Sequence, residues 1–124
     1  MEIIKSHKEL RVYKLSFDLA MEIFEMTKNF PKDERYSLTD QIRRSSRSVV
    51  ANISEAFRKR RYPKSFVAKL SDVEGEAAET QTWIEFAYSC NYIPLEKRDD
   101  LLSKYDHVIG MVITMISKPN NWSL

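Results

Sequence analysis

Residues 37–61 read SLTDQIRRSSRSVVANISEAFRKRR, and this stretch decides the fold. Apolar or small residues recur in it every three or four positions, the spacing of one helix face. These inward positions are Leu38, Ile42, Ser45, Val49, Ile53 and Ala56 or Phe57. The opening Ser37-Leu38-Thr39-Asp40 resembles a capping box with Asp in place of Glu. The pattern predicts a helix that starts near Ser37 and buries one face.

Prolines separate this helix from three further helical patterns. Asn29-Phe30-Pro31 closes the first pattern, Pro63 and Pro94 open the third and fourth, and Pro119 ends the last. The predicted helices cover about residues 9–28, 37–61, 63–90 and 94–118. Because their connections are short, consecutive helices must zigzag. The sequence therefore predicts an all-α, antiparallel, up-down-up-down four-helix bundle in a single domain, residues 1–124.

The composition agrees with a few long helices. The chain has two glycines in 124 residues, fewer than the turns of an all-β protein need. Gly75 falls inside the predicted third helix, where we expect close packing to compensate for its cost. The sequence lacks the apolar run of a signal peptide or a membrane span. Cys90 is the single cysteine. We expect a cytoplasmic location and a buried, structural Cys90.

Catalytic and metal-binding patterns are missing from the sequence. Di-iron helical bundles use Glu-x-x-His on two helices. Here His7 precedes the first predicted helix, and His107 has Lys104 three residues upstream. No Gly-rich phosphate loop or Ser/His/Asp order appears. We expect no enzyme activity, no metal, no cofactor and no small-molecule substrate.

Charge is distributed unevenly along the chain. Residues 41–64 contain a single acid, Glu55, and eight basic residues: Arg43, Arg44, Arg47, Arg58, Lys59, Arg60, Arg61 and Lys64. Residues 70–90 contain five acids and no base. In one interpretation the two segments lie side by side and neutralise each other. In the other, the basic residues form a surface for an anionic partner such as RNA.

Asn52 and Glu55 stand three residues apart, on or beside the core face of the second predicted helix. Polar side chains at such positions need hydrogen-bond partners. Gln41 on the same helix, and Glu79 and Gln81 on the next, are candidate members of a polar network. The network either fixes the helix register or is a recognition site for a partner.

Apolar residues exceed what one core requires. The first helical pattern has a wide apolar face, and the third carries Phe66, Trp83, Phe86 and Tyr88 on more than one face. Surplus apolar surface indicates a second interface. We therefore expect a homo-oligomer.

Three runs of residues resemble a known family, the four-helix-bundle proteins encoded in intervening sequences of bacterial 23S ribosomal RNA genes. The runs are Leu10-Arg11-Val12-Tyr13, the segment FPKDERYSLTDQIRR at residues 30–44, and the segment SVVANISE at residues 48–55. Two departures are Ala56, where the family usually has glycine, and Glu76, where it usually has a small residue. The resemblance covers nearly the whole chain and is most specific over residues 30–55.

The resemblance implies a helical bundle that assembles into a ring, a pentamer. Similar bundles accompany the reverse transcriptases of diversity-generating retroelements, where they are implicated in nucleic-acid and protein binding. The resemblance supplies no catalytic residues. Two hypotheses follow. The first is a non-enzymatic oligomer that associates with RNA through the eight basic residues. The alternative is a protein–protein interaction scaffold with no nucleic-acid role.

Overall fold

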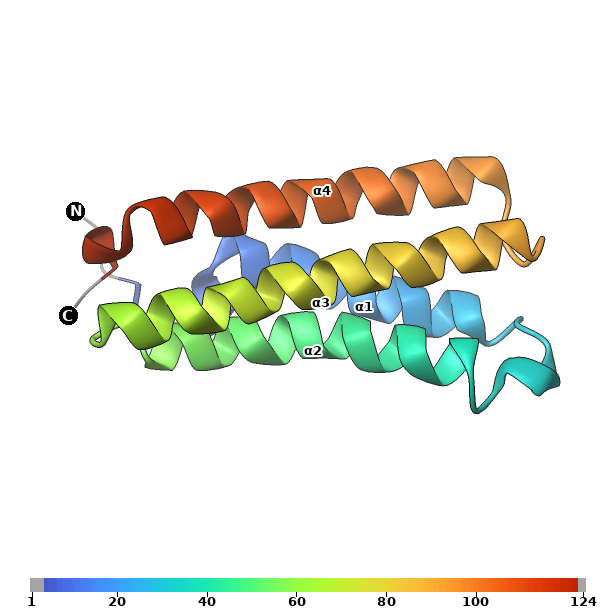
Figure 1. The fold of residues 1–124 in the computed structure, drawn as a ribbon, viewed down its shortest axis with the longest axis horizontal. Helices are drawn as coiled ribbons and strands as arrows, with labels where there is room; N and C mark the ends of the chain where they lie inside the picture. The colour runs from blue at the N-terminus through green and yellow to red at the C-terminus, as the bar shows by residue number, and fades with distance from the viewer. Residues whose placement is uncertain (1–3, 123–124) are drawn as a thin grey trace.

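The computed structural model describes residues 4–122, in which four long helices and no strand occur. The long helices are α1 (Arg11–Thr27), α2 (Leu38–Arg58), α3 (Pro63–Ser89) and α4 (Leu95–Ser117). Three short 3-10 turns accompany them: η1 (His7–Glu9), η2 (Lys32–Glu34) and η3 (Pro119–Asn121). Each long helix runs opposite to the one before it, and both chain ends lie at the same end of the bundle (Figure 1). The predicted antiparallel four-helix bundle is confirmed.

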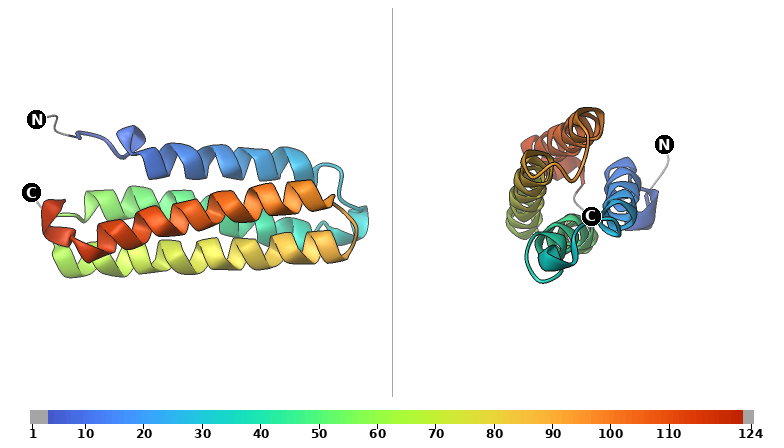
Figure 2. Two further views of the ribbon diagram at one scale, coloured as in Figure 1. Left: turned by 90° about the horizontal axis from the view of Figure 1, so that it is seen from above. Right: turned by 90° about the vertical axis from the view of Figure 1, so that its right-hand side faces the viewer.

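The core lies on the common axis of the four helices, as the end-on view in Figure 2 shows. All the inward positions predicted on α2, from Leu38 to Phe57, are buried. On α3, the residues with the same helical spacing are buried as well: Phe66, Leu70, Val73, Ala77, Thr80, Ile84 and Ala87. Leu19 and Ile23 of α1 and Leu101 and Val108 of α4 complete the core. Helical periodicity thus locates the core residues of α2 and α3 correctly.

The N-terminus of α2 is capped differently from the prediction. The Ser37 side chain makes no capping hydrogen bond. Instead, Glu34 Oε1 accepts hydrogen bonds from Ser37 Oγ at 2.6 Å and from the Leu38 amide at 3.3 Å. Glu34 Oε2 accepts a third from the Tyr92 hydroxyl at 2.7 Å, which ties η2 to the α3–α4 connection. These bonds lower the pKa of Glu34 and raise the pKa of Tyr92 to about 12. The predicted capping box is therefore wrong.

Several side chains lie elsewhere than the sequence predicts. Gly75 is exposed, and a Cβ built there meets no atom within 4 Å, so close packing does not explain this glycine. Cys90 is exposed rather than buried, because α3 ends at Ser89. Phe66 is fully buried, whereas Phe86 is exposed as expected.

None of the helices in the described residues is long and apolar enough to cross a membrane. Among residues 4–122, no three His, Cys, Asp or Glu side chains gather so that they could hold a metal ion.

Candidate nucleic-acid interface

The eight predicted basic residues occupy two separate places on the bundle. Arg43, Arg44 and Arg47 lie in the first half of α2. Arg58 ends α2, and the other four follow it through the α2–α3 turn to Lys64 in the first turn of α3. At 1.5 Å per helical residue, Arg43 and Arg58 are about 22 Å apart along the axis. The eight residues therefore do not form one compact site.

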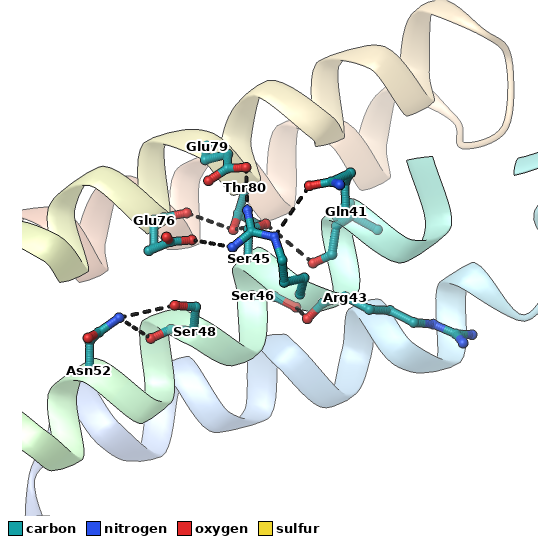
Figure 3. A network of polar contacts seen from close by, with 11 residues as sticks. Gln41, Arg43, Ser45, Ser46, Ser48, Asn52, Glu76, Glu79 and Thr80 are labelled. Carbon is teal, nitrogen blue, oxygen red and sulfur yellow. Dashed lines mark hydrogen bonds and ion pairs between the residues drawn. The ribbon is translucent and has the colours of Figure 1, made fainter. Parts of the chain in front are cut away.

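Arg44 is held between α2 and α3 by carboxylates. Its Nη1 lies 3.4 Å from Glu76 Oε2, its Nη2 donates to Glu79 Oε1, and its Nε donates to Gln41 Oε1 at 3.3 Å (Figure 3). The Glu79 carboxylate raises the pKa of this guanidinium. At Arg44, the acidic helix therefore neutralises a charge of the basic helix. This is the first of the two interpretations of the charge pattern.

A buried hydroxyl pair lies beneath this ion pair. Thr80 Oγ1 donates to Ser45 Oγ at 2.8 Å, and both residues are fully buried (Figure 3). Two small polar residues at this point let α2 and α3 approach closely while satisfying each other's hydrogen-bonding groups. We call the two hydroxyls and the Arg44 ion pairs together the α2–α3 seam.

Asn52 and Glu55 do not form the buried network predicted for them. Asn52 Nδ2 donates to the Ser48 carbonyl at 2.9 Å and to Ser48 Oγ at 3.0 Å. Glu55 is paired with Lys69 of α3 at 2.7 Å, and its side chain is 53% exposed. Lys69 Nζ also lies 3.4 Å from Asn52 Oδ1. The four residues form a link between α2 and α3 at the surface of the bundle.

Gln41 and Glu79 belong to the Arg44 group rather than to Asn52 and Glu55. Gln81 faces α4, where its Nε2 donates to the Leu102 carbonyl at 3.2 Å and to Asp106 Oδ1 at 2.8 Å. Lys69, the central cation of the link, was not among the predicted residues. No local pattern indicated it, because Arg58 and Lys59 stand three and four residues after Glu55 in the sequence.

Four cations around the α2–α3 turn form the turn cluster: Arg58, Lys59, Arg61 and Lys64. All four are exposed. None of them is in an ion pair with another residue of the described chain, 4–122. The exposed ring of Tyr62 stands among them. The turn cluster is a convex, positively charged corner with an aromatic side chain beside it.

Arg60 differs from the other residues of the turn. Because α2 ends at Arg58 and not at Arg61 as predicted, the chain bends, and the Arg60 guanidinium folds over Phe57, 3.8 Å from the ring centroid. Its Nη1 donates to the Phe57 carbonyl at 2.8 Å. Burial, together with the charges of Arg58 and Arg61, lowers the pKa of Arg60. Arg60 therefore caps the helix end rather than facing a partner.

Arg43 and Arg47 point away from α3, toward α1. Arg43 Nε donates to Thr27 Oγ1 at 2.7 Å, and its guanidinium carbon lies 4.8 Å from the centroid of the Phe24 ring. The guanidinium carbon of Arg47 lies 5.6 Å from the same centroid. Neither arginine has a carboxylate partner within the described residues.

The acids of α3 do not reach these cations. Glu76 and Glu79 pair with Arg44, Asp72 lies 4.0 Å from Lys69, and Glu85 lies 3.6 Å from Arg98 of α4. The paired acids of α3 thus contact Arg44 of α2, Arg98 of α4 and, at Asp72, Lys69 of α3 itself. Both ends of the basic segment keep their positive charge.

The comparisons with known proteins agree with the fold. The family model described as 23S rRNA-intervening sequence protein matches residues 8–114. The chain is also similar to a protein of unknown function from the S23 ribosomal protein family of Bacteroides thetaiotaomicron, known from a crystal structure at 1.70 Å resolution. The two are 27% identical with a TM-score of 0.77, over 86% of this chain and 95% of that one. No curated protein matches the chain. Because the family model covers most of its length, the chain belongs to the 23S rRNA-intervening sequence protein family.

Proposed function

We propose that this protein is a cytoplasmic, non-enzymatic homo-oligomer that binds RNA through the turn cluster. The observation that carries the proposal is the difference between Arg44, which two carboxylates occupy, and the turn cluster, which has no carboxylate partner in the described chain. Unpaired, exposed cations gain most from phosphate groups, because no existing ion pair has to be broken.

The chemistry of the turn cluster suits a phosphate backbone better than a base sequence. Four cations on a convex turn can each contact a different phosphate, and the Tyr62 ring offers a surface for an unpaired base. Neither feature reads the hydrogen-bonding edges of bases. The proposed binding is therefore electrostatic, tolerant of sequence and sensitive to salt.

A turn variant tests the proposal: Arg58→Gln, Lys59→Gln, Arg61→Gln and Lys64→Gln. Fluorescence anisotropy with labelled single-stranded RNAs of unrelated sequence should show weaker binding to all of them. A swap variant that exchanges Arg and Lys at the same four positions keeps the charge and should keep the affinity. A second control replaces Lys8, Arg11, Lys14 and Lys118 by Gln, which lowers the net charge of +2 by the same four units elsewhere. Equal loss in this control would contradict a role specific to the turn cluster.

The alternative, an interaction scaffold, is supported by a different surface. On the outer side of α1, Phe17 is 46% and Met21 47% exposed, and the Tyr13 and Phe17 rings lie 6.0 Å apart. The bundle core does not use these side chains, so they form an apolar stripe suited to another copy of the chain. The family resemblance implies that the assembly is a pentamer.

Oligomerisation can be tested independently of RNA. Light scattering should give several times the chain mass of 14.6 kDa. Phe17→Glu together with Met21→Glu should reduce the mass to one chain without loss of helical circular dichroism. A clean monomer for the unaltered protein at tens of micromolar would overturn the oligomer. An oligomer that binds no RNA would favour the scaffold.

A further inference from the structure

Three cations surround one phenyl ring at the α1–α2 corner. Lys28 Nζ lies 4.9 Å from the centroid of Phe24, beside the guanidinium carbons of Arg43 at 4.8 Å and Arg47 at 5.6 Å. The ring attracts each cation, but the cations repel one another. Among residues 4–122, the one carboxylate paired with any of them is Glu25, 3.0 Å from Lys28, and both of those side chains are more than half exposed. The local charge therefore remains strongly positive.

Arg43 is fixed without using all its donors. A guanidinium has five N–H groups. Within the described chain, Nε donates to Thr27 Oγ1 at 2.7 Å and Nη2 to the Phe24 carbonyl at 3.5 Å. Figure 3 shows the Arg43 side chain directed away from the group around Gln41, Glu76 and Glu79. Its remaining donors are held in place and available to an acceptor outside the protein.

Two shallow hollows meet beside this cluster. One, of about 480 Å³, is lined by Arg35, Thr39, Asp40, Arg43, Arg44 and Arg47. The other, of about 510 Å³, shares Arg35, Thr39 and Arg43 with it. The second hollow adds Lys28, Lys32 and Tyr36, whose ring is 86% exposed. Among the described residues, Asp40 is the one acid that lines either hollow, against four arginines in the first.

We propose that this α1–α2 corner binds a phosphorylated nucleotide of single-stranded RNA. This inference deepens the proposed function and rests on it. Arg35, Arg43 and Arg47 hold the phosphate, since a guanidinium can give two parallel hydrogen bonds to one phosphate group. The adjoining base stacks on the Tyr36 ring across the shared wall of the two hollows.

The corner differs from the turn cluster in how its cations are held. The turn-cluster side chains are exposed on a convex surface, and each can meet a phosphate in many positions. At the corner, Arg43 and Arg47 are held over Phe24, and the surface is concave. Preorganised donors lose less conformational entropy on binding. The corner is therefore suited to one nucleotide, and the turn cluster to the backbone of a longer strand.

Nuclear magnetic resonance titration of the full chain separates the two sites with small probes. The probes are inorganic phosphate, the 5′-phosphorylated uridine dinucleotide and the same dinucleotide without the 5′-phosphate. We expect the 5′-phosphorylated dinucleotide to shift the Nε–H signals of Arg43 and Arg47 and the amide of Tyr36. It should bind at least about five-fold more tightly than inorganic phosphate. This ratio corresponds to the lower end of the stacking energy of a base on an aromatic ring. Equal affinity for phosphate and the 5′-phosphorylated dinucleotide would overturn the inference. So would the absence of corner shifts with the dinucleotide without the 5′-phosphate, because that probe still has an internucleotide phosphate beside a base.

Variants at exposed positions connect the signals to the corner. Arg35→Gln with Arg47→Gln should abolish the shifts, whereas Lys8→Gln with Lys14→Gln, which removes the same charge, should leave them. Tyr36→Ala should reduce the affinity for the 5′-phosphorylated dinucleotide to that for phosphate. Retained affinity in Tyr36→Ala would overturn base stacking.

The turn variant separates this inference from the proposed function. It should still show the dinucleotide shifts at the corner while losing affinity for long RNA. Shifts confined to the turn cluster would overturn the corner site and leave the proposed function standing. Corner shifts with unchanged long-RNA binding in the turn variant would overturn the turn cluster instead.

Discussion

The α2–α3 seam and the turn cluster both take cations from the basic residues 41–64, yet these cations are in opposite situations. In the seam, Arg44 lies between Glu76 and Glu79, over the buried Ser45 and Thr80 hydroxyls. In the turn cluster, no carboxylate of the described chain pairs with any of the four cations. The difference shows that the basic residues of one segment divide into charges paired within the fold and charges without a carboxylate partner in the described chain. Stability should therefore depend on the seam, and RNA binding on the turn cluster.

Thr80→Val should show the largest effect on the seam. It removes the donor to Ser45 Oγ while keeping the side-chain shape, so the buried Ser45 hydroxyl keeps only its longer hydrogen bond to the Ile42 carbonyl, at 3.4 Å. We expect the free energy of unfolding to fall by about 1–3 kcal/mol. Chemical denaturation measures it, and Thr80→Ser, which keeps the hydroxyl, is the matched control. Unchanged stability in Thr80→Val would mean that the hydroxyl pair does not hold the seam.

Arg44→Gln should have a smaller effect, because the ion pairs of Arg44 are partly exposed. We expect a loss of about 0.5–1 kcal/mol, since Glu76 and Glu79 would face each other without a cation. RNA affinity should stay close to that of the unaltered protein. Glu79→Gln added to Arg44→Gln should restore part of the stability. If Arg44→Gln weakens RNA binding as much as the turn variant does, the distinction between paired and unpaired cations is wrong.

Gly75→Ala tests a position outside the α2–α3 seam and the turn cluster, on the exposed side of α3. Because a Cβ there meets no atom within 4 Å, alanine adds helix propensity without a clash. We expect a gain in stability of about 0.5–1 kcal/mol and no change in RNA affinity. Thermal denaturation measures the gain. A loss would show that a partner or another copy of the chain packs closely against this glycine.

The smallest effect on stability should come from lowering the pH until Glu55 is protonated and loses its ion pair with Lys69. The hydrogen bond from Lys69 lowers the pKa of Glu55 below its ordinary value of 4.5, with smaller help from Lys59. The link therefore stabilises the fold above pH 4.5, and this contribution disappears as the pH falls through the lowered pKa. Glu55→Gln should flatten the acid side of the stability profile slightly. An unchanged profile would contradict the pairing.

Periodicity and the prolines were enough to predict the bundle and the buried faces of α2 and α3. Ile42, Val49, Leu70 and Ile84 are buried because the 3.6-residue repeat places them on one face, whatever their exact neighbours. The fold class depends only on that repeat and on the prolines that interrupt it. The family resemblance, confirmed over residues 8–114, pointed to the same architecture.

The candidate site could be predicted only in outline, because it depends on how neighbouring helices are aligned. Glu55 pairs with Lys69 of α3, a contact between helices that the spacing of residues within α2 does not predict. The pairing of Arg44 with Glu76 and Glu79 requires the register of α2 against α3, which no local pattern contains. The fold-back of Arg60 depends on α2 ending at Arg58. Local patterns specify elements, whereas charge pairing is set by tertiary contacts.

The salt dependence of RNA affinity tests whether the turn cluster contacts RNA phosphates, because the slope of this dependence counts the phosphate contacts. For the unaltered protein, the logarithm of the association constant should fall linearly with the logarithm of the salt concentration. In the turn variant the slope should flatten by about 0.7 for each lost contact with single-stranded RNA. Four lost contacts therefore predict a change of about three units, with the swap variant unchanged. A turn variant with the slope of the unaltered protein would contradict the account.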